Sequence, residues 1–141
     1  MGTALLRRAL LGWLLVVICI TELPLAQGAD SAASPIRRYS IVSGAEGVPL
    51  NVIEQGAAGQ PVIVLVHGFG QSHASFEAQF TASELNRHFR LVSYDLRGHG
   101  LSGKPWSREA YTTSGNWADD LSRVIDATGA RKVVLLGWSY G

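Results

Sequence analysis

The sequence predicts an α/β domain built on a mostly parallel sheet that carries helices on both faces. Short runs of consecutive aliphatic residues alternate along the chain with helical patterns, which is typical of a parallel sheet. The runs 62–66, 89–94 and 132–136 are continuous rather than alternating, so these strands are expected to be covered on both faces. The composition agrees, because 47% of the 141 residues are hydrophobic and 16% are charged. These proportions exclude a disordered tail.

The beginning of the chain has the pattern of a secretory signal peptide. Two arginines precede the apolar run 10–20, and a patch of small residues follows it. This order predicts a signal peptide over residues 1–28, a flexible tether over residues 29–37, and export to the periplasm or out of the cell. The alternative is an uncleaved leader that anchors the protein in a membrane, although the run is short for a span of about 20 residues.

The predicted domain covers residues 38–141 and begins with a hairpin. Arg38–Val42 and Val48–Ile53 flank the glycine-containing turn Ser43–Gly47, so they are expected to pair as antiparallel strands. Val62–Val66 follows, and its five aliphatic residues predict a strand that is buried on both faces.

Helical and strand patterns alternate after this point. Residues 72–87 predict a less regular helix with Phe76 and Phe80 on one side, and Phe89–Tyr94 predicts the next buried strand.

An amphipathic helix precedes the last predicted strand. Its apolar residues fall on one helical face: Trp117, Leu121, Val124 and Ile125. Gly129 occupies the position of a left-handed helix cap, and Lys132–Leu136 predicts the final strand. The predicted order is β-β-β-α-β-α-β.

The last five residues carry the strongest chemical signal, the pattern G-x-S-x-G. Gly137, Ser139 and Gly141 directly follow the predicted strand. In such a strained strand-to-helix turn the serine hydroxyl projects above the sheet, and the small residues on either side permit the tight bend. The pattern alone would arise by chance about once in ten glycine-rich sequences, so the prediction depends on the strand before it.

A second signal, H-G-F-G, follows the strand 62–66. Acyl transfer requires two backbone N–H groups aimed at the oxyanion of the tetrahedral intermediate. The turn that contains Gly68 and Gly70 can present the N–H of Phe69, and Tyr140 after the serine can supply the second.

The third signal, D-L-R-G-H-G-L-S, follows the strand 89–94. Two glycines and two opposite charges predict a rigid loop with internal hydrogen bonds, in which Asp95 and Arg97 are the candidate partners. We interpret the loop as structural rather than catalytic. The residues assigned to it are Asp95, Arg97, Gly98, Gly100 and Ser102.

Together these motifs resemble the α/β-hydrolase superfamily, in particular its esterase, lactonase and cofactor-free haloperoxidase-like branch. The resemblance covers residues 38–141 and implies the α/β-hydrolase fold without a cofactor. It implies that Ser139 is the nucleophile and that the backbones of Phe69 and Tyr140 form the oxyanion hole. Epoxide hydrolases and haloalkane dehalogenases resemble this pattern elsewhere but use aspartate in place of the serine.

The serine also needs a base and an orienting acid, which in this fold come later in the chain. Ser139 is the third residue from the end, so we expect the chain to be the N-terminal half of a hydrolase, truncated after the serine turn. We accordingly expect residues 29–141 alone to show no esterase turnover. Of the four histidines, His99 is the one to test as a substitute base.

The leading functional hypothesis is an exported serine hydrolase that cleaves a carboxylic ester or lactone through an acyl-enzyme on Ser139. Phe69, Trp138 and Tyr140 predict aromatic walls around the reacting position. The same residues also fit perhydrolase or haloperoxidase-like chemistry, a peptidase, or carbon–carbon bond hydrolysis. A truncated, non-catalytic hydrolase-like protein that only binds a ligand is the alternative of a different class.

Charge and cysteine content restrict the partners. Twelve basic and 11 acidic residues give a net charge of +1, which provides no field to gather nucleic acid. One cysteine excludes a disulfide framework, and no histidine pair has metal-site spacing, so no metal is expected. The expected partner is a small ester-like substrate, with membrane contact only through an uncleaved leader.

Overall fold

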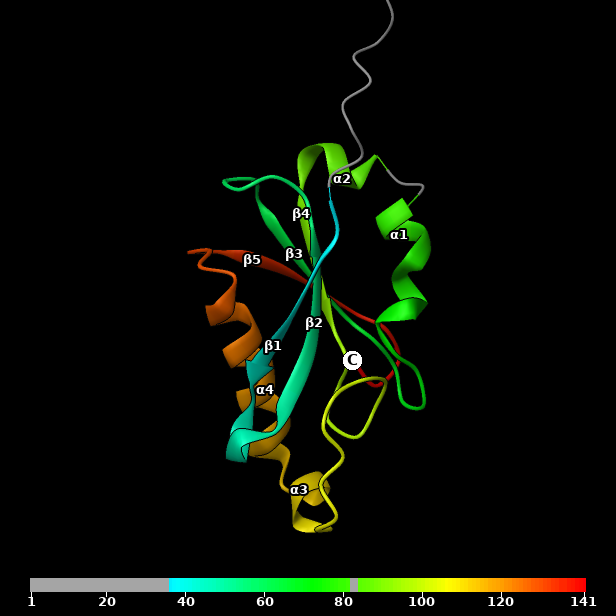
Figure 1. The fold of residues 1–141 in the computed structure, drawn as a ribbon, viewed down its shortest axis with the longest axis vertical. Coiled ribbons are helices and arrows are strands. Elements are labelled where there is room, and N and C mark those ends of the chain that lie inside the picture. The colour runs from blue at the N-terminus through cyan, green and yellow to red at the C-terminus, as the bar shows by residue number, and fades with distance from the viewer. Residues whose placement is uncertain (1–35, 82–83) are drawn as a thin grey trace, which may run out of the picture. The chain divides into compact units, whose positions relative to one another are not determined.

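The computed structural model describes residues 36–81 and 84–141, which form a five-stranded mixed sheet with helices on both faces (Figure 1). The predicted signal peptide 1–28, and all of the tether except residues 36 and 37, lie outside the described residues. The strands are β1 (Arg38–Ser43), β2 (Pro49–Gln55), β3 (Val62–Val66), β4 (Arg90–Tyr94) and β5 (Val133–Gly137).

The strands lie in the order β1-β2-β4-β3-β5. β3 pairs in parallel with both β4 and β5, whereas β2 is antiparallel to β1 and to β4. Four strands therefore share one direction and β2 alone opposes it. The predicted α/β fold, with an opening hairpin and a mostly parallel sheet, is confirmed.

Helical segments connect the strands of the sheet. They are the 3-10 turns η1 (Ala45–Gly47) and η2 (His73–Phe76), and the helices α1 (Glu77–Thr81), α2 (Leu85–His88), α3 (Glu109–Thr112) and α4 (Ser114–Ala127). Figure 1 shows α4 on one side of the sheet and α1 on the other. Within the described ranges, none of these helices has both the length and the apolar character that crossing a bilayer requires.

Alternate residues of β3 enter two separate hydrophobic cores. Val64 packs in a core with Val124 of α4, whereas Leu65 packs on the opposite face with Phe76 and Phe80. All five residues of β3 are buried, as predicted. The strand is continuously apolar because neither of its faces meets water.

The helix predicted over residues 72–87 is broken into η2, α1 and α2, so the prediction of one helix was wrong. Two side chains bind carbonyls in this segment. The Asn86 amide donates to the carbonyl of Phe80, and the Thr81 hydroxyl donates to the carbonyl of Glu77 at 2.9 Å. Such bonds from side chain to backbone compete with the regular pairing of a helix.

Helix α3 was not predicted from the sequence. It is a single turn, and the hydroxyl of Ser107 accepts the N–H of Ala110 near its start at 3.2 Å. A serine that accepts an amide hydrogen at a helix start is the local signal that marks such a turn.

Helix α4 and its cap agree with the prediction. Trp117, Leu121 and Ile125 pack against the core that contains Val124. Gly129 has a φ of +66°, and its N–H donates to the carbonyl of Asp126 at 3.0 Å. Glycine adopts this left-handed conformation without the steric cost of a Cβ atom.

A fully buried ion pair ties the loop after β4 to α4. Arg97 donates twice to the carboxylate of Asp120, through Nε at 2.7 Å and through one terminal nitrogen at 2.8 Å, and both side chains are 0% exposed. Arg97 also donates to the carbonyl of Ala110 at 2.8 Å, and Asp120 accepts the N–H of Ala45 at 2.8 Å. The pair therefore joins η1, α3 and α4.

The expected pairing of Asp95 with Arg97 was wrong. Arg97 reaches across to Asp120, 23 residues later, while Asp95 binds donors from β2, η2 and its own loop. A buried charge needs a full set of partners, and in both cases the surrounding elements supply more of them than the loop could.

The outer edge of the sheet at β5 is apolar and open within the described part of the chain. β5 pairs with β3 on one side, and Val134, Leu135 and Leu136 are about half exposed.

Replacing Asp120 by asparagine is expected to lower the free energy of unfolding by about 3–5 kcal/mol, because Arg97 would keep a buried charge without a counter-ion. Chemical denaturation of the full-length protein measures the change. The matched control is Glu84→Gln, which breaks the Glu84–Arg87 pair, whose side chains are both 74% exposed. This exposed pair should contribute little, so equal losses in the two variants would contradict the prediction.

Candidate active site

The three sequence motifs meet at the carboxyl edge of the sheet. Val66 at the end of β3 is level with Tyr94 of β4 and Gly137 of β5 in the strand register. Because these strands are parallel, the segments that follow them leave the sheet at the same edge, where Figure 1 marks the end of the chain. This edge is the usual place for a site in α/β sheets.

Ser139 lies in a strained turn directly after β5. Its φ is +57°, a left-handed conformation that residues other than glycine seldom adopt. The turn is closed by the N–H of Trp138, which donates to Val66 at 3.0 Å, and by the N–H of Gly141, which donates to Trp138 at 3.0 Å.

Neither glycine of the serine turn leaves room for a side chain. A Cβ atom on Gly137 would overlap the carbonyl of Gly141, and a Cβ atom on Gly141 would overlap the carbonyl oxygen of Val66. The steric pattern that the sequence predicts for this turn is therefore present.

The turn after β3 packs directly against the serine. A Cβ atom built on Gly68 would lie 3.0 Å from the Cβ of Ser139 and 2.9 Å from Oε1 of Gln71. Gly70, two residues later, has a φ of +70° that reverses the chain. Glycine at position 68 thus allows the backbone to approach the serine closely.

His67 fixes the carbonyl group of this turn. Its Nε2 accepts the N–H of Leu96 at 3.0 Å, so the ring proton is on Nδ1, which donates to the carbonyl of Gly68 at 2.7 Å. Burial lowers the pKa of His67 and favours this neutral form.

Two backbone amides beside the serine remain available. Among the described residues, no acceptor takes the N–H of Phe69 or the N–H of Tyr140. The rings of these two residues meet edge to face with centroids 6.3 Å apart, and Phe69 is 77% exposed. These are the amides that the sequence assigned to an oxyanion hole, and that assignment stays a prediction.

Asp95 organises the loop after β4. Its buried carboxylate accepts Nδ2 of Asn51 at 3.0 Å, the N–H of Leu101 at 2.8 Å, and both the N–H and Nδ1 of His73 at 2.7 and 2.8 Å. Burial alone would raise the pKa of Asp95, but these hydrogen bonds outweigh it and hold the pKa below its usual value.

The other loop residues complete this network. Ser102 donates to the carbonyl of Asp95 at 2.5 Å and accepts the N–H of Asn51 at 2.9 Å. Gly98 and Gly100 have φ of +79° and +46°, and Gly100 packs against the Asp95 carboxylate, where a Cβ would overlap it. Sequence reasoning missed His73, because no spacing links it to Asp95.

No histidine of the described residues hydrogen-bonds to Ser139. His99 donates through Nδ1 to the carbonyl of Arg97 at 2.9 Å, and its ring lies between those of His67 and Phe69, at 5.3 and 5.5 Å. His99 therefore supports the turn after β3 in this arrangement.

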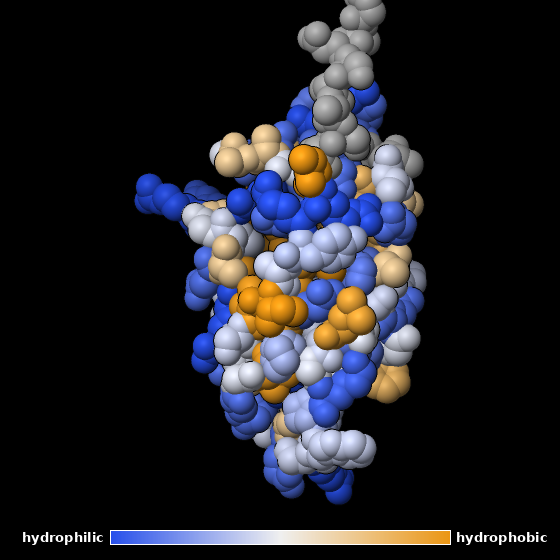
Figure 2. All heavy atoms as spheres, viewed as in Figure 1, coloured by the Kyte–Doolittle hydropathy of each residue, from blue (hydrophilic) through white to orange (hydrophobic). Residues whose placement is uncertain are grey.

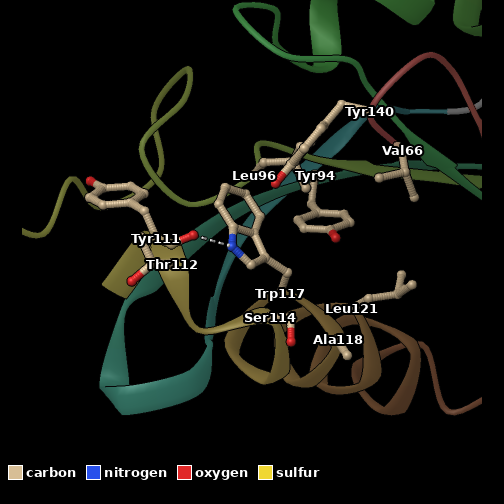
Figure 3. A pocket seen from close by; sticks show the side chains of 11 residues that line it. Val66, Tyr94, Leu96, Tyr111, Thr112, Ser114, Trp117, Ala118, Leu121 and Tyr140 are labelled. Atoms are coloured by element: carbon tan, nitrogen blue, oxygen red, sulfur yellow. Dashed lines mark hydrogen bonds between the residues drawn. The ribbon is translucent and has the colours of Figure 1, made fainter. Parts of the chain in front are cut away.

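An apolar cavity of about 410 Å³ lies next to the serine turn (Figure 3). The ring of Tyr140 reaches toward Trp117, with the ring centroids 5.5 Å apart, and Trp117 Nε1 donates to the carbonyl of Tyr111 at 3.0 Å. Among the described residues that line the cavity there is no carboxylate, lysine or arginine. Burial raises the pKa of Tyr94, which also lines it, so this phenol stays neutral.

The described residues hold no group of three or more histidine, cysteine or acidic side chains arranged to bind a metal ion. The hydroxyl of Ser139, the backbone amides of Phe69 and Tyr140, and the imidazoles of His67, His73 and His99 lie at this edge.

Comparison with known proteins shows similarity to one family. Residues 61–141 match the family model described as alpha/beta hydrolase fold. Epoxide hydrolase A of Mycobacterium tuberculosis is 36% identical over 95 residues, which are 67% of this chain and 29% of that protein. A "putative non-heme chloroperoxidase" of Synechocystis is 40% identical over 88 residues, which are 62% of this chain and 30% of that protein.

A solved structure is similar in fold and in sequence. The crystal structure of a "putative aryl esterase" from Burkholderia cenocepacia has a TM-score of 0.70 and 44% identity. The match covers 74% of this chain and 38% of that one. The chain thus spans well under half the length of each of these proteins.

Stability should fall as the pH drops below about 6.5 because of His67. The unfolded imidazole, with a pKa of about 6.5, takes up a proton more readily than the buried one, whose pKa is lowered. The contribution of His67 to the free energy of unfolding is complete above pH 6.5 and is lost as the pH falls below that value. Urea denaturation between pH 8 and 5 should show a weaker pH dependence for His67→Gln than for wild type. His88→Gln, at an exposed position, is the control, and identical pH dependence in all three proteins would contradict the prediction.

Proposed function

This chain belongs to the α/β-hydrolase fold family, and on that premise we propose that the protein is an exported serine hydrolase that cleaves a carboxylic ester or lactone through an acyl-enzyme on Ser139. The observation that carries the proposal is the setting of Ser139. The serine lies in a strained turn, Gly68 packs against it, and the amides of Phe69 and Tyr140 are free.

In the first half of the reaction, Oγ of Ser139 attacks the substrate carbonyl carbon while a base takes the hydroxyl proton. The carbonyl oxygen becomes an oxyanion, and the N–H groups of Phe69 and Tyr140 donate to it. The intermediate then expels the alcohol, which leaves with the proton, and an ester on Ser139 remains. Water attacks that ester in the same way and releases the carboxylic acid.

The base and its orienting acid are proposed to come from residues other than those described. His67 has both ring nitrogens engaged, with the carbonyl of Gly68 and the N–H of Leu96. The rings of His73 and His99 are bound to Asp95 and to the carbonyl of Arg97. Each of these imidazoles is held by the carboxyl-edge loops, with no hydrogen bond to the serine. A base delivered from elsewhere would complete the site.

The serine favours an ester over an epoxide, although epoxide hydrolases are among the relatives. If a serine opened an epoxide, it would form an ether on Oγ, and water has no carbonyl carbon to attack in an ether. The attack of a serine on an ester leaves an ester that water can hydrolyse. The 44% identity to the Burkholderia protein supports the same substrate class.

A second candidate reaction is peroxide-dependent halogenation. The Synechocystis relative, at 40% identity, supports it. Peroxide in place of water would attack the same acyl-enzyme and release a peracid. The peracid would oxidise a halide ion to a hypohalous acid and be reduced to the carboxylic acid, so the two reactions share Ser139 and both oxyanion amides. Rates of ester hydrolysis and of halogenation with peroxide, measured on the same preparation, separate them.

Replacing Ser139 by alanine should abolish the hydrolysis of p-nitrophenyl acetate by the full-length protein, lowering kcat by about 10⁴-fold or more. A fluorophosphonate probe should label the wild-type protein at Ser139 and leave the variant unlabelled, as peptide mass spectrometry can show. Turnover that survives the substitution would refute the acyl-enzyme on this residue.

Gly68→Ala should lower kcat by about tenfold or more, because the new methyl group must displace Ser139 or the Gln71 side chain. Gly115→Ala is the control, since a Cβ at position 115 would have nothing within 4 Å. That change should leave kcat unaltered and raise stability by about 0.5–1 kcal/mol in the helix. Wild-type kcat in Gly68→Ala would contradict the proposed site geometry.

A further inference from the structure

The side chain of Gln71 closes the turn that carries the Phe69 amide. Its Oε1 accepts the N–H of Gly68 at 3.0 Å, and the backbone N–H of Gln71 donates to the carbonyl of Gly68 at 3.3 Å. The N–H and the carbonyl of Gly68 are therefore both bound by Gln71. The second hydrogen bond to its carbonyl comes from His67.

This double attachment determines the direction of the next amide. The carbonyl of Gly68 and the N–H of Phe69 belong to one planar, trans peptide unit, so they point in opposite directions. With the carbonyl bound to His67 and Gln71, the N–H of Phe69 is turned away from them and is left without a partner in the described residues. Glycine has no side chain to restrict its own dihedral angles, so the restriction comes from Gln71 together with His67.

The carboxamide of Gln71 also lies close to the reacting serine. The Cβ position built on Gly68 is 2.9 Å from Oε1 of Gln71 and 3.0 Å from Cβ of Ser139. Any charge on the Gln71 side chain would act over a few ångströms on an oxyanion bound at this turn, where electrostatic interactions are strong. The neutral amide accepts the hydrogen bond without adding negative charge.

We propose that Gln71 is a positioning residue of the oxyanion site, which aims the Phe69 amide by holding Gly68 and keeps the site free of negative charge. The inference rests on the proposed function, because it assumes an anionic intermediate on Ser139. It predicts that the hydrogen bond and the charge at position 71 have separable effects. The hydrogen bond orients the N–H of Phe69, and a neutral side chain avoids repelling the oxyanion.

The chain provides a matched control in Gln60. Its Oε1 accepts the N–H of Ala57 at 2.7 Å, three residues earlier, as Gln71 does with Gly68. Gln60 precedes β3, whereas Gln71 follows it, so the two side chains make the same contact near opposite ends of one strand. A change that only loosens such a turn should therefore act at both positions.

The test compares Gln71→Glu, Gln71→Met and Gln60→Glu in the full-length protein with p-nitrophenyl acetate as substrate and phenylboronic acid as inhibitor. Boronic acids form an anionic tetrahedral adduct with a serine and so report on the oxyanion site. Gln71→Glu should lower kcat by about tenfold or more with little change in KM, and should raise the inhibition constant by a similar factor. Gln71→Met should lower kcat a few-fold and raise the inhibition constant a few-fold. Gln60→Glu should have the kcat and the inhibition constant of the wild type.

Two results would overturn the proposal for Gln71. One is equal behaviour of Gln71→Glu and Gln60→Glu. The other is a fall in kcat with an unchanged inhibition constant, which indicates a smaller fraction of active protein and no effect on the oxyanion. Ser139→Ala is measured alongside: if it retains turnover, the proposed function itself is wrong, whereas if it is inactive, a failure at Gln71 concerns this inference alone.

Discussion

The register of three parallel strands is the constraint on which the site depends. β3 pairs with β4 and β5 so that Val66, Tyr94 and Gly137 are level, and each strand ends at that point. The carbonyl of Val66 then receives the N–H of Trp138, which extends the pairing by one residue before the chain turns at the serine. A shift of one residue would exchange the two faces of β3 and break both cores, so core packing fixes the geometry of the site.

Buried polar groups link this edge to the rest of the domain. Asp95 collects four hydrogen bonds from β2, η2 and its own loop, and Arg97 with Asp120 joins the same loop to α4. Such groups are costly to bury unless every partner is present. The loop after β4 therefore has few alternative arrangements, and through His67 and His99 it supports the turn that faces the serine.

Local patterns in the sequence were enough to predict what depends on neighbouring residues. The aliphatic run of β3, the cap at Gly129 and the close-packed glycines of the serine turn follow from short-range rules, and all three are present. The bonds of His73 to Asp95 and of Arg97 to Asp120 could not be predicted, because their partners lie 22 and 23 residues apart in the chain. Gln71 gave no signal either, since a glutamine in a polar loop is ordinary until the fold places it beside Gly68.

The left-handed backbone of Ser139 also bears on how this family could diversify. Asparagine and aspartate tolerate that conformation better than most residues other than glycine. A change from serine to aspartate would therefore leave the backbone of the turn, its two glycines and the hydrogen bond to Val66 largely unaltered. The backbone determines where the side chain at position 139 is placed and does not determine its chemical identity, so the residue there could change before any strand had to move.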